Sequence, residues 1–365
     1  MEKLMEFLIF ASAKLRSFSA LCQSLLLELC LQMCYNLIEK TNTLSWNEGA
    51  KMRRLLSIIL IILIAVSLVA VSGCSGGGAR LELNTDFKKP TTLGDGEGKR
   101  VKVILLLGQS NATGCALNSY LEKNIGTEQY SKYEEGFSSV LTNYSVDNWT
   151  NTSNGEFVKT TVGFGHRGEY FGPELGMAEV LSEAYPNETV VILKYTYSGS
   201  CLKNQWLDDK KRGEIYNACI KFTETYMDAL LESNYDAKIG AICWMQGESD
   251  AIGRLASKYY DNQKRFVSFL REDLDKYADD GKIYFIDAGI QAGDIFPRYE
   301  VVNESKARLA NESELNLYFS TIDEGLTTGY EPEEAPDLAH YDSMSELKLG
   351  HLFAEYIISS YEKRN

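Results

Sequence analysis

Ser110 is a candidate nucleophile because of its position in the sequence. Residues 101–107 read VKVILLL, and Gly108, Gln109 and Ser110 follow at once. A short apolar run rich in Val, Ile and Leu is typical of a strand buried on both faces. Open α/β sheets bind ligands just beyond the carboxyl ends of such strands. Gly108 permits a sharp turn that would lift the Ser110 hydroxyl out of the sheet for nucleophilic attack. The alternative is that Ser110 caps a helix.

A serine nucleophile requires a base, which is usually a histidine because its pKa lies near neutrality. The sequence contains three histidines. We interpret His351, within an apolar-periodic segment, as structural or surface-exposed. His166 lies in a Gly-rich loop and is either a pocket residue or a solvated one. His340 follows Asp337 by three residues, a spacing that lets the carboxylate hold the imidazole in one tautomer. Because Asp-x-x-His is frequent by chance, the pair alone is a weak signal.

Acyl transfer also needs hydrogen-bond donors that face the developing oxyanion. The backbone N–H groups of Ser110 and Gly199 are two candidates, and Gly199 has no side chain to obstruct its amide. The side-chain amide of Gln246, at the end of a third apolar run, is another. The alternatives are an ordinary turn at Gly199 and a buried, hydrogen-bonded core amide at Gln246.

The elements that must position these residues alternate along the chain. Apolar runs predict strands at 101–107, 189–195, 239–245 and 282–288, with a weaker one at 315–322. Helical spacing of apolar residues covers 173–184, 216–233, 256–277 and 343–361. This alternation predicts an α/β fold with a parallel sheet covered on both faces. The candidate residues would then converge on one edge of the sheet. The polar stretch 118–167 predicts an elaborated loop near that edge.

Four blocks of sequence together resemble a known family. They are Gly108-Gln109-Ser110-Asn111, Gly172-Pro173-Glu174, Trp244-Met245-Gln246-Gly247-Glu248-Ser249-Asp250 and Asp337-x-x-His340. In this order they resemble the sialate O-acetylesterase-like branch of the SGNH hydrolases, which includes the acetylxylan esterases of carbohydrate esterase family six. The resemblance extends from about Arg100 to the C-terminus. It implies a three-layer α/β/α sandwich with a mainly parallel, flavodoxin-like sheet, no metal and no cofactor.

The resemblance also implies residue roles. Ser110 would be the nucleophile, His340 the base and Asp337 the orienting acid, and Ser110, Gly199 and Gln246 would form the oxyanion hole. Supporting or pocket residues would be Gln109, Asn111, Glu248 and His166, with Glu248 as a fallback acid. The chain departs from the family pattern at Ala112, Thr113, Met245 and the pair Ser200-Cys201. These departures bear on the substrate and leave the triad intact.

The expected activity is the removal of O-acetyl groups from a carbohydrate such as acetylxylan or sialic acid. One alternative keeps the enzyme and changes the substrate to a lipid or peptidoglycan acetyl ester. Another is a non-catalytic glycan-binding lipoprotein on a hydrolase scaffold, since the 22 tyrosines could stack on sugars. The net charge of −14 argues against nucleic-acid binding, which needs a basic surface.

The N-terminal region resembles a bacterial lipoprotein signal. Met52-Arg53-Arg54 precedes an apolar stretch at 55–71, and small residues lead to Cys74. The resemblance implies cleavage before Cys74 and a lipid on its thiol, so that 52–73 is the signal. An uncleaved transmembrane anchor is the alternative, and either one predicts export. We expect 1–51 to be a mis-assigned start, 74–99 a tether and 100–365 the esterase domain.

Four cysteines remain in the body of the chain, at 115, 201, 219 and 243. Their spacing lacks the CxxC pattern of zinc sites, so a structural zinc ion is not expected. A disulfide between Cys115 and Cys201 is one prediction for an oxidising compartment. The alternative is that all four are buried thiols.

Overall fold

Strand β1 (Arg100–Gly108) lies in the middle of an eight-stranded sheet in this computed structural model, which describes residues 81–363. From one edge, the strands are β12 (Asn316–Phe319), β11 (Tyr284–Ala288), β10 (Asp236–Met245), β1, β7 (Thr189–Thr196), β3 (Phe137–Val146) and β4 (Asn151–Thr152), and β5 (Val158–Thr160) also pairs with β3. The neighbours from β12 to β3 are parallel, whereas β4 and β5 are antiparallel to β3. The buried faces of β1 explain its unbroken apolar sequence.

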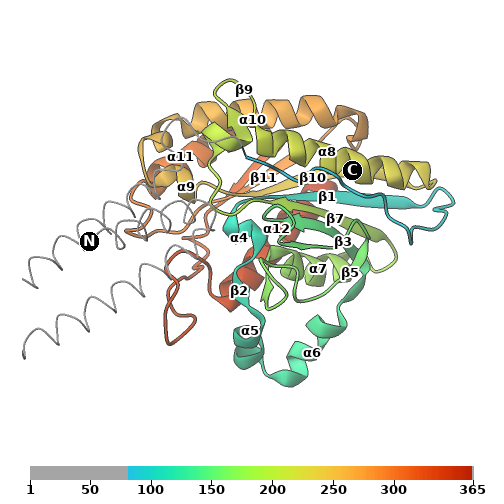
Figure 1. Cartoon of the computed structure of the whole chain (residues 1–365), viewed down its shortest axis with the longest axis horizontal. Helices are drawn as coiled ribbons and strands as arrows, with labels where there is room; N and C mark the ends of the chain where they lie inside the picture. The colour runs from blue at the N-terminus through green and yellow to red at the C-terminus, as the bar shows by residue number, and fades with distance from the viewer. Residues whose placement is uncertain (1–80, 364–365) are drawn as a thin grey trace, which may run out of the picture. The chain divides into compact units, whose positions relative to one another are not determined.

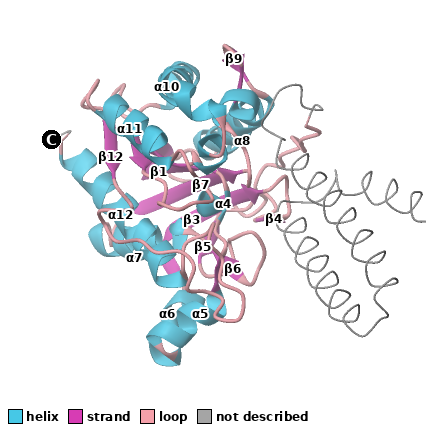
Figure 2. Cartoon of the chain, turned by 90° about the vertical axis from the view of Figure 1, so that its left-hand side faces the viewer, coloured by secondary structure: helices cyan, strands magenta, loops and turns pink. Residues whose placement is uncertain are grey.

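Helices cover both faces of the sheet (Figures 1 and 2). One layer contains α7 (Pro173–Ala184) and α12 (Ser343–Glu362), and the other contains α8 (Glu214–Glu232), α10 (Tyr259–Leu274) and α11 (Tyr299–Ala310). Helices α7 and α12 approach closely where both carry glycine. A Cβ atom on Gly176 would lie 2.1 Å from the Leu347 carbonyl oxygen, and one on Gly350 would lie 2.2 Å from that of Pro173. The predicted three-layer α/β/α sandwich is confirmed.

Shorter elements connect the layers. They are α4 (Ser110–Thr113), α5 (Asn118–Ile125), α6 (Thr127–Glu135), α9 (Glu248–Ala251), the antiparallel pairs β2 (Ala116–Leu117) with β6 (Tyr170–Phe171) and β8 (Leu207–Asp208) with β9 (Lys211–Arg212), and the single-turn helices η2 (Leu202–Trp206), η3 (Arg254–Lys258) and η4 (Asp275–Tyr277). None of the helices within residues 81–363 is long and apolar enough to cross a bilayer.

The prediction of a loop at 118–167 is wrong, because this stretch contains two helices and a full strand of the main sheet. Strand β3 is buried, but it includes the polar residues Thr142, Asn143 and Ser145. Thr142 Oγ1 lies 2.7 Å from Thr160 Oγ1, and Asn143 Nδ2 donates to the Gly155 carbonyl at 2.8 Å. These partners satisfy the Thr142 hydroxyl and the Asn143 amide nitrogen, whereas Asn143 Oδ1 and Ser145 Oγ have no hydrogen-bond partner among the described residues. The strand therefore lacks the apolar run that identified the others.

The segment 81–99 was predicted to be a tether, yet it packs against the body without regular structure of its own up to Lys99. Leu81, Leu83, Phe87 and Leu93 all contact the hydrophobic core. The ring of Phe87 stacks on Trp149 with centroids 5.9 Å apart. The predicted extension 1–51, the signal 52–73 and Cys74 lie outside the described residues.

Candidate active site

The turn after β1 places Ser110 at the carboxyl edge of the sheet. Gly108 has a φ of +149°, and a Cβ atom there would lie 1.9 Å from the Met245 carbonyl oxygen, so only glycine fits. The next amide, Gln109 N–H, donates to that same oxygen at 3.0 Å. Gln109 is the N-cap of α4 and Ser110 is its first residue. The Ser110 hydroxyl has no hydrogen-bond partner among residues 81–363.

His340 and Asp337 form a hydrogen-bonded pair on the loop before α12. His340 Nδ1 lies 2.7 Å from Asp337 Oδ2. The other carboxylate oxygen accepts from the backbone N–H groups of Ala339 at 2.8 Å and of His340 at 3.2 Å. Burial opposes ionisation of this carboxyl, but the hydrogen bonds from His340 and the backbone outweigh it and lower the pKa of Asp337. The carboxylate can therefore fix the imidazole with Nε2 as the proton acceptor.

Asn111 holds the histidine loop next to the serine. Its Oδ1 accepts from the Tyr341 N–H at 3.2 Å, and its Nδ2 donates to the Ala339 carbonyl at 3.3 Å. The residues on both sides of the histidine are thus bound to the neighbour of Ser110. Within the described chain, no hydrogen bond joins the Ser110 hydroxyl to His340. The structure brings the two onto neighbouring loops without a direct bond.

Cys115 also acts on the imidazole of His340. Its place in the sequence did not predict such a role. Its Sγ is 3.7 Å from the Ser110 carbonyl oxygen. Burial opposes protonation of the imidazole, but the charge interaction with Cys115 and the hydrogen bond to the Asp337 carboxylate outweigh it and raise the pKa of His340 well above its usual range. No disulfide joins Cys115 to Cys201 in the described chain.

Glu248 supports Asn111. It is almost fully buried, and its Oε1 accepts from Asn111 Nδ2 at 2.7 Å. Its Oε2 has no hydrogen-bond partner among the described residues. Burial raises the pKa of Glu248. Since the ring nitrogen of His340 bonds to Asp337, the geometry favours Asp337 over Glu248 as the orienting acid.

Two backbone amides at this edge are available to a ligand. The N–H groups of Ser110 and Gly199 have no acceptor within residues 81–363. Gly199 is exposed and has a φ of +68°, a left-handed conformation that glycine adopts without strain. Both amides are therefore candidates for binding an oxyanion.

The amide of Gln246 is already engaged. Its Nε2 lies 2.7 Å from Asp250 Oδ2, 3.0 Å from the Ser200 carbonyl oxygen and 3.2 Å from Gln109 Oε1. Its Oε1 accepts from the Tyr259 hydroxyl at 3.0 Å. An amide nitrogen has two hydrogens, so Gln246 could bind an oxyanion only by releasing one of these acceptors. Its role in the oxyanion hole stays a prediction.

Within residues 81–363, no hydrogen bond joins the His166 side chain to Ser110 or His340. His166 Nδ1 is 2.5 Å from Asp147 Oδ2, and both side chains are largely buried. Sequence reasoning missed Asp147, because it lies in the polar stretch that was interpreted as a loop.

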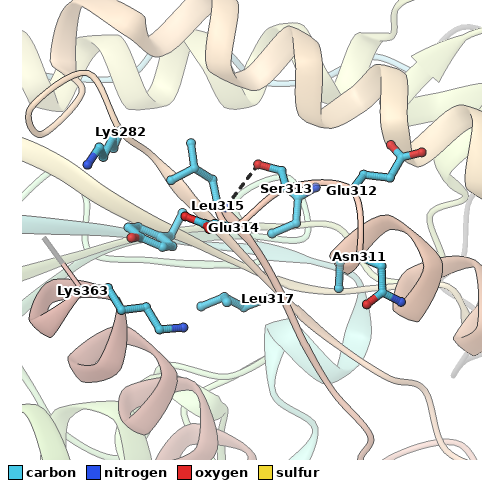
Figure 3. Close-up of a pocket in the computed structure, with 11 residues that line it drawn as sticks. Lys282, Asn311, Glu312, Ser313, Glu314, Leu315, Leu317 and Lys363 are labelled. Carbon is cyan, nitrogen blue, oxygen red and sulfur yellow. Dashed lines mark hydrogen bonds between the residues drawn. The ribbon is translucent and has the colours of Figure 1, made fainter.

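A surface hollow of about 1030 Å³ lies away from these residues, beside the amino ends of β11 and β12 (Figure 3). Lys282, Glu314, Leu317 and Lys363 are among its lining residues, and no candidate site residue is. Because Ser110 follows the carboxyl end of a parallel strand, the hollow is at the opposite edge of the sheet. Among residues 81–363, no cluster of three or more His, Cys, Asp or Glu side chains could hold a metal ion.

Comparisons with known proteins identify a family and a fold. Residues 100–359 match a family described as "Carbohydrate esterase, sialic acid-specific acetylesterase". The chain resembles the structure of a protein from Arabidopsis thaliana, with 18% identity, a TM-score of 0.51, and coverage of 71% of this chain and 98% of that one. It also resembles NanS, with 15% identity, a TM-score of 0.52, and coverage of 73% and 99%. At these identities the likeness concerns the fold. No curated protein sequence matches the chain.

Proposed function

Because the chain belongs to the carbohydrate esterase family of sialic acid-specific acetylesterases, and is thus a carbohydrate O-acetylesterase, we propose that it deacetylates a glycan with Ser110 as nucleophile. The Ser110 Oγ attacks the acetyl carbonyl carbon while His340 Nε2 takes the hydroxyl proton. The C–O bond to the sugar then breaks, and His340 returns the proton to the leaving sugar oxygen. A water molecule, deprotonated by His340, attacks the acetyl-serine and releases acetate.

One observation carries this proposal: Asn111 binds the loop of the Asp337–His340 pair beside Ser110. Asn111 donates a hydrogen bond to the Ala339 carbonyl and accepts one from the Tyr341 N–H, and these bonds join segments that are far apart in sequence. A nucleophile, a base and an orienting carboxylate are the groups that acyl transfer requires. The absence of a Ser110–His340 hydrogen bond does not contradict it, because such bonds often tighten only in the substrate complex.

We propose that the oxyanion forms against the backbone amides of Ser110 and Gly199. Both N–H groups lack a protein acceptor in the described chain, and they come from the ends of adjacent strands, β1 and β7. Gln246 would act chiefly by orienting Gln109, whose Oε1 it bonds. The loss of one oxyanion donor typically lowers kcat by about 10²–10³-fold.

We further propose that the enzyme is exported and held on the membrane by a lipid on Cys74. The basic start at Met52, the apolar stretch 55–71 and the small residues before Cys74 support this. The substrate would then be a glycan outside the cytoplasm, such as acetylxylan or an acetylated sialic acid. Incorporation of a labelled fatty acid into the wild-type chain, and its loss in Cys74→Ala, tests the anchor.

The first test is acetate release from an aryl acetate and from acetylated xylan, sialic acid, pectin and peptidoglycan. Ser110→Ala should reduce the turnover by several orders of magnitude, because triad residues act as a unit. Ser131→Ala is the matched control, since Ser131 is an exposed residue of α6. Wild-type turnover in Ser110→Ala would refute the mechanism. Sugar binding without acetate release by the wild type would favour a glycan-binding protein.

A further inference from the structure

We propose that Asp147 is a positioning residue that holds the Gly199 amide in place for the oxyanion. The inference rests on the proposed function, since it concerns the same reaction. Asp147 directly follows β3, at the carboxyl edge of the sheet, beside the end of β7. Its side chain is 11% exposed. It is not one of the residues that the sequence pattern identified.

Three hydrogen bonds converge on the Asp147 carboxylate. Its Oδ1 accepts from the Ser198 N–H at 2.6 Å. Its Oδ2 accepts from the Ser198 hydroxyl at 3.0 Å and lies 2.5 Å from His166 Nδ1. The carboxylate thus binds both the backbone and the side chain of the residue before Gly199. It fixes the peptide that leads into the proposed donor.

This Asp–His–Ser group is not a second catalytic triad. In a triad the histidine lies between the acid and the serine. Here the carboxylate lies between them, and within residues 81–363 no hydrogen bond joins His166 to Ser198. The Ser198 hydroxyl donates to the acid, so no base is placed to activate it.

The same network reaches the serine side of the site. The Ser198 hydroxyl also lies 3.3 Å from Thr113 Oγ1, on α4. The backbone N–H of His166 donates to the Gly114 carbonyl at 2.8 Å, just beyond α4. Ser110 is the first residue of that helix. Asp147 therefore connects the two segments that present the proposed oxyanion amides.

The backbone at Asp147 is strained, which is a second indication of a role at the site. Asp147, Asn148 and Trp149 have φ values of 49°, 55° and 72° in succession. A non-glycine residue in this region costs about 1–3 kcal/mol, and such residues cluster at functional sites. Long-range contacts hold the run in place. Asn148 Oδ1 accepts from the Asn84 N–H at 2.6 Å, and Trp149 stacks on Phe87.

The test compares Asp147→Ala and Asp147→Asn with the wild type, through kcat, KM and the melting temperature on an aryl acetate. A displaced amide acts on the transition state more than on substrate binding. We expect Asp147→Ala to lower kcat by about 10–100-fold, with KM changed less than about threefold. Asp147→Asn keeps an acceptor for the Ser198 N–H and should restore part of the lost kcat.

Glu179→Gln is the matched control, because Glu179 also binds a histidine, with Oε2 2.7 Å from His351 Nε2, but on helices away from the site. It should leave kcat unchanged. A folded Asp147→Ala with wild-type kcat, or with a loss of stability alone, overturns the proposal. If Asp147→Ala does not fold, Ser198→Ala replaces it, with a lower kcat at constant KM in support and an unchanged kcat against. Activity that persists in Ser110→Ala would instead refute the proposed function.

Discussion

Two ionisable groups act on the imidazole of His340, the Asp337 carboxylate and Cys115. Together they outweigh burial and raise the pKa of the imidazole. A general base must be neutral to accept a proton, so a raised pKa leaves less active enzyme at neutral pH. The value of kcat/KM should therefore rise with pH through the raised pKa of His340, above the pH at which an ordinary histidine titrates.

Replacement of Cys115 by serine should move this acidic limb to lower pH. Serine keeps the size of the side chain but does not ionise, so one contribution that favours the imidazolium is lost. The measurement is kcat/KM for an aryl acetate against pH in the wild type and in Cys115→Ser. Cys219→Ala is the control, since Cys219 is buried in α8. An unchanged limb in Cys115→Ser would mean that the thiol does not act on His340.

Among the helices and strands, one buried lysine forms hydrogen bonds to several of the segments around the candidate site. Lys194, on β7, has no exposed side-chain surface, and its Nζ lies 2.5 Å from Glu174 Oε2 on α7. The ammonium also donates to the Thr113 and Phe164 carbonyls, both at 2.8 Å. All three hydrogens of the Lys194 ammonium are in hydrogen bonds. These bonds connect α4 to the sheet and to α7. Glu174 belongs to the second sequence block, which explains why that block accompanies the serine.

Lys194→Met should lower the free energy of unfolding by about 3–5 kcal/mol, because it leaves the Glu174 carboxyl buried without its partner. Urea unfolding followed by tryptophan fluorescence measures the loss. Lys123→Met removes a lysine whose ion pair with Glu333 is exposed on both sides. This control should cost less than about 1 kcal/mol. Equal losses in the two variants would contradict a structural role for the buried pair.

At the scale of the whole molecule, residues 81–99 extend the body beyond the sheet and its helices. The Leu81 N–H donates to Glu214 Oε2 at 2.7 Å, at the start of α8. Phe87 packs edge-on against Phe222 of α8, with centroids 5.4 Å apart. The segment thus covers one end of a helix layer and supports the strained turn that carries Asp147.

Phe87→Ala should lower the free energy of unfolding by about 1–3 kcal/mol, less than for a fully buried ring because Phe87 is only half-buried. Thermal and urea unfolding of the purified chain measure this loss. Leu231→Ala is the control, since that side chain is 41% exposed and its removal should matter little. Wild-type stability in Phe87→Ala would restore the view of 81–99 as a free tether.

The apolar and amphipathic periodicity of the sequence predicted the α/β class, five strands of the main sheet and the edge at which the candidate residues meet. Burial on both faces leaves an apolar run that can be recognised locally, as in β1, β7 and β10. The Asp337–His340 pair could also be predicted, because three residues of spacing are enough to form it.

The assembly of the candidate site depends on contacts between segments that are far apart in the sequence. The bond from Tyr341 to Asn111 spans 230 residues, and the one from Ser198 to Asp147 spans 51. Strand β3 was missed because polar side chains interrupt its apolar pattern, and Thr142 and Asn143 find their partners 18 and 12 residues away in the chain. The hydrogen bonds of Gln246 and the effect of Cys115 on His340 likewise depend on how the fold brings these loops together. Local periodicity records which face of an element is buried, but hydrogen bonds between loops depend on where the fold brings those loops together.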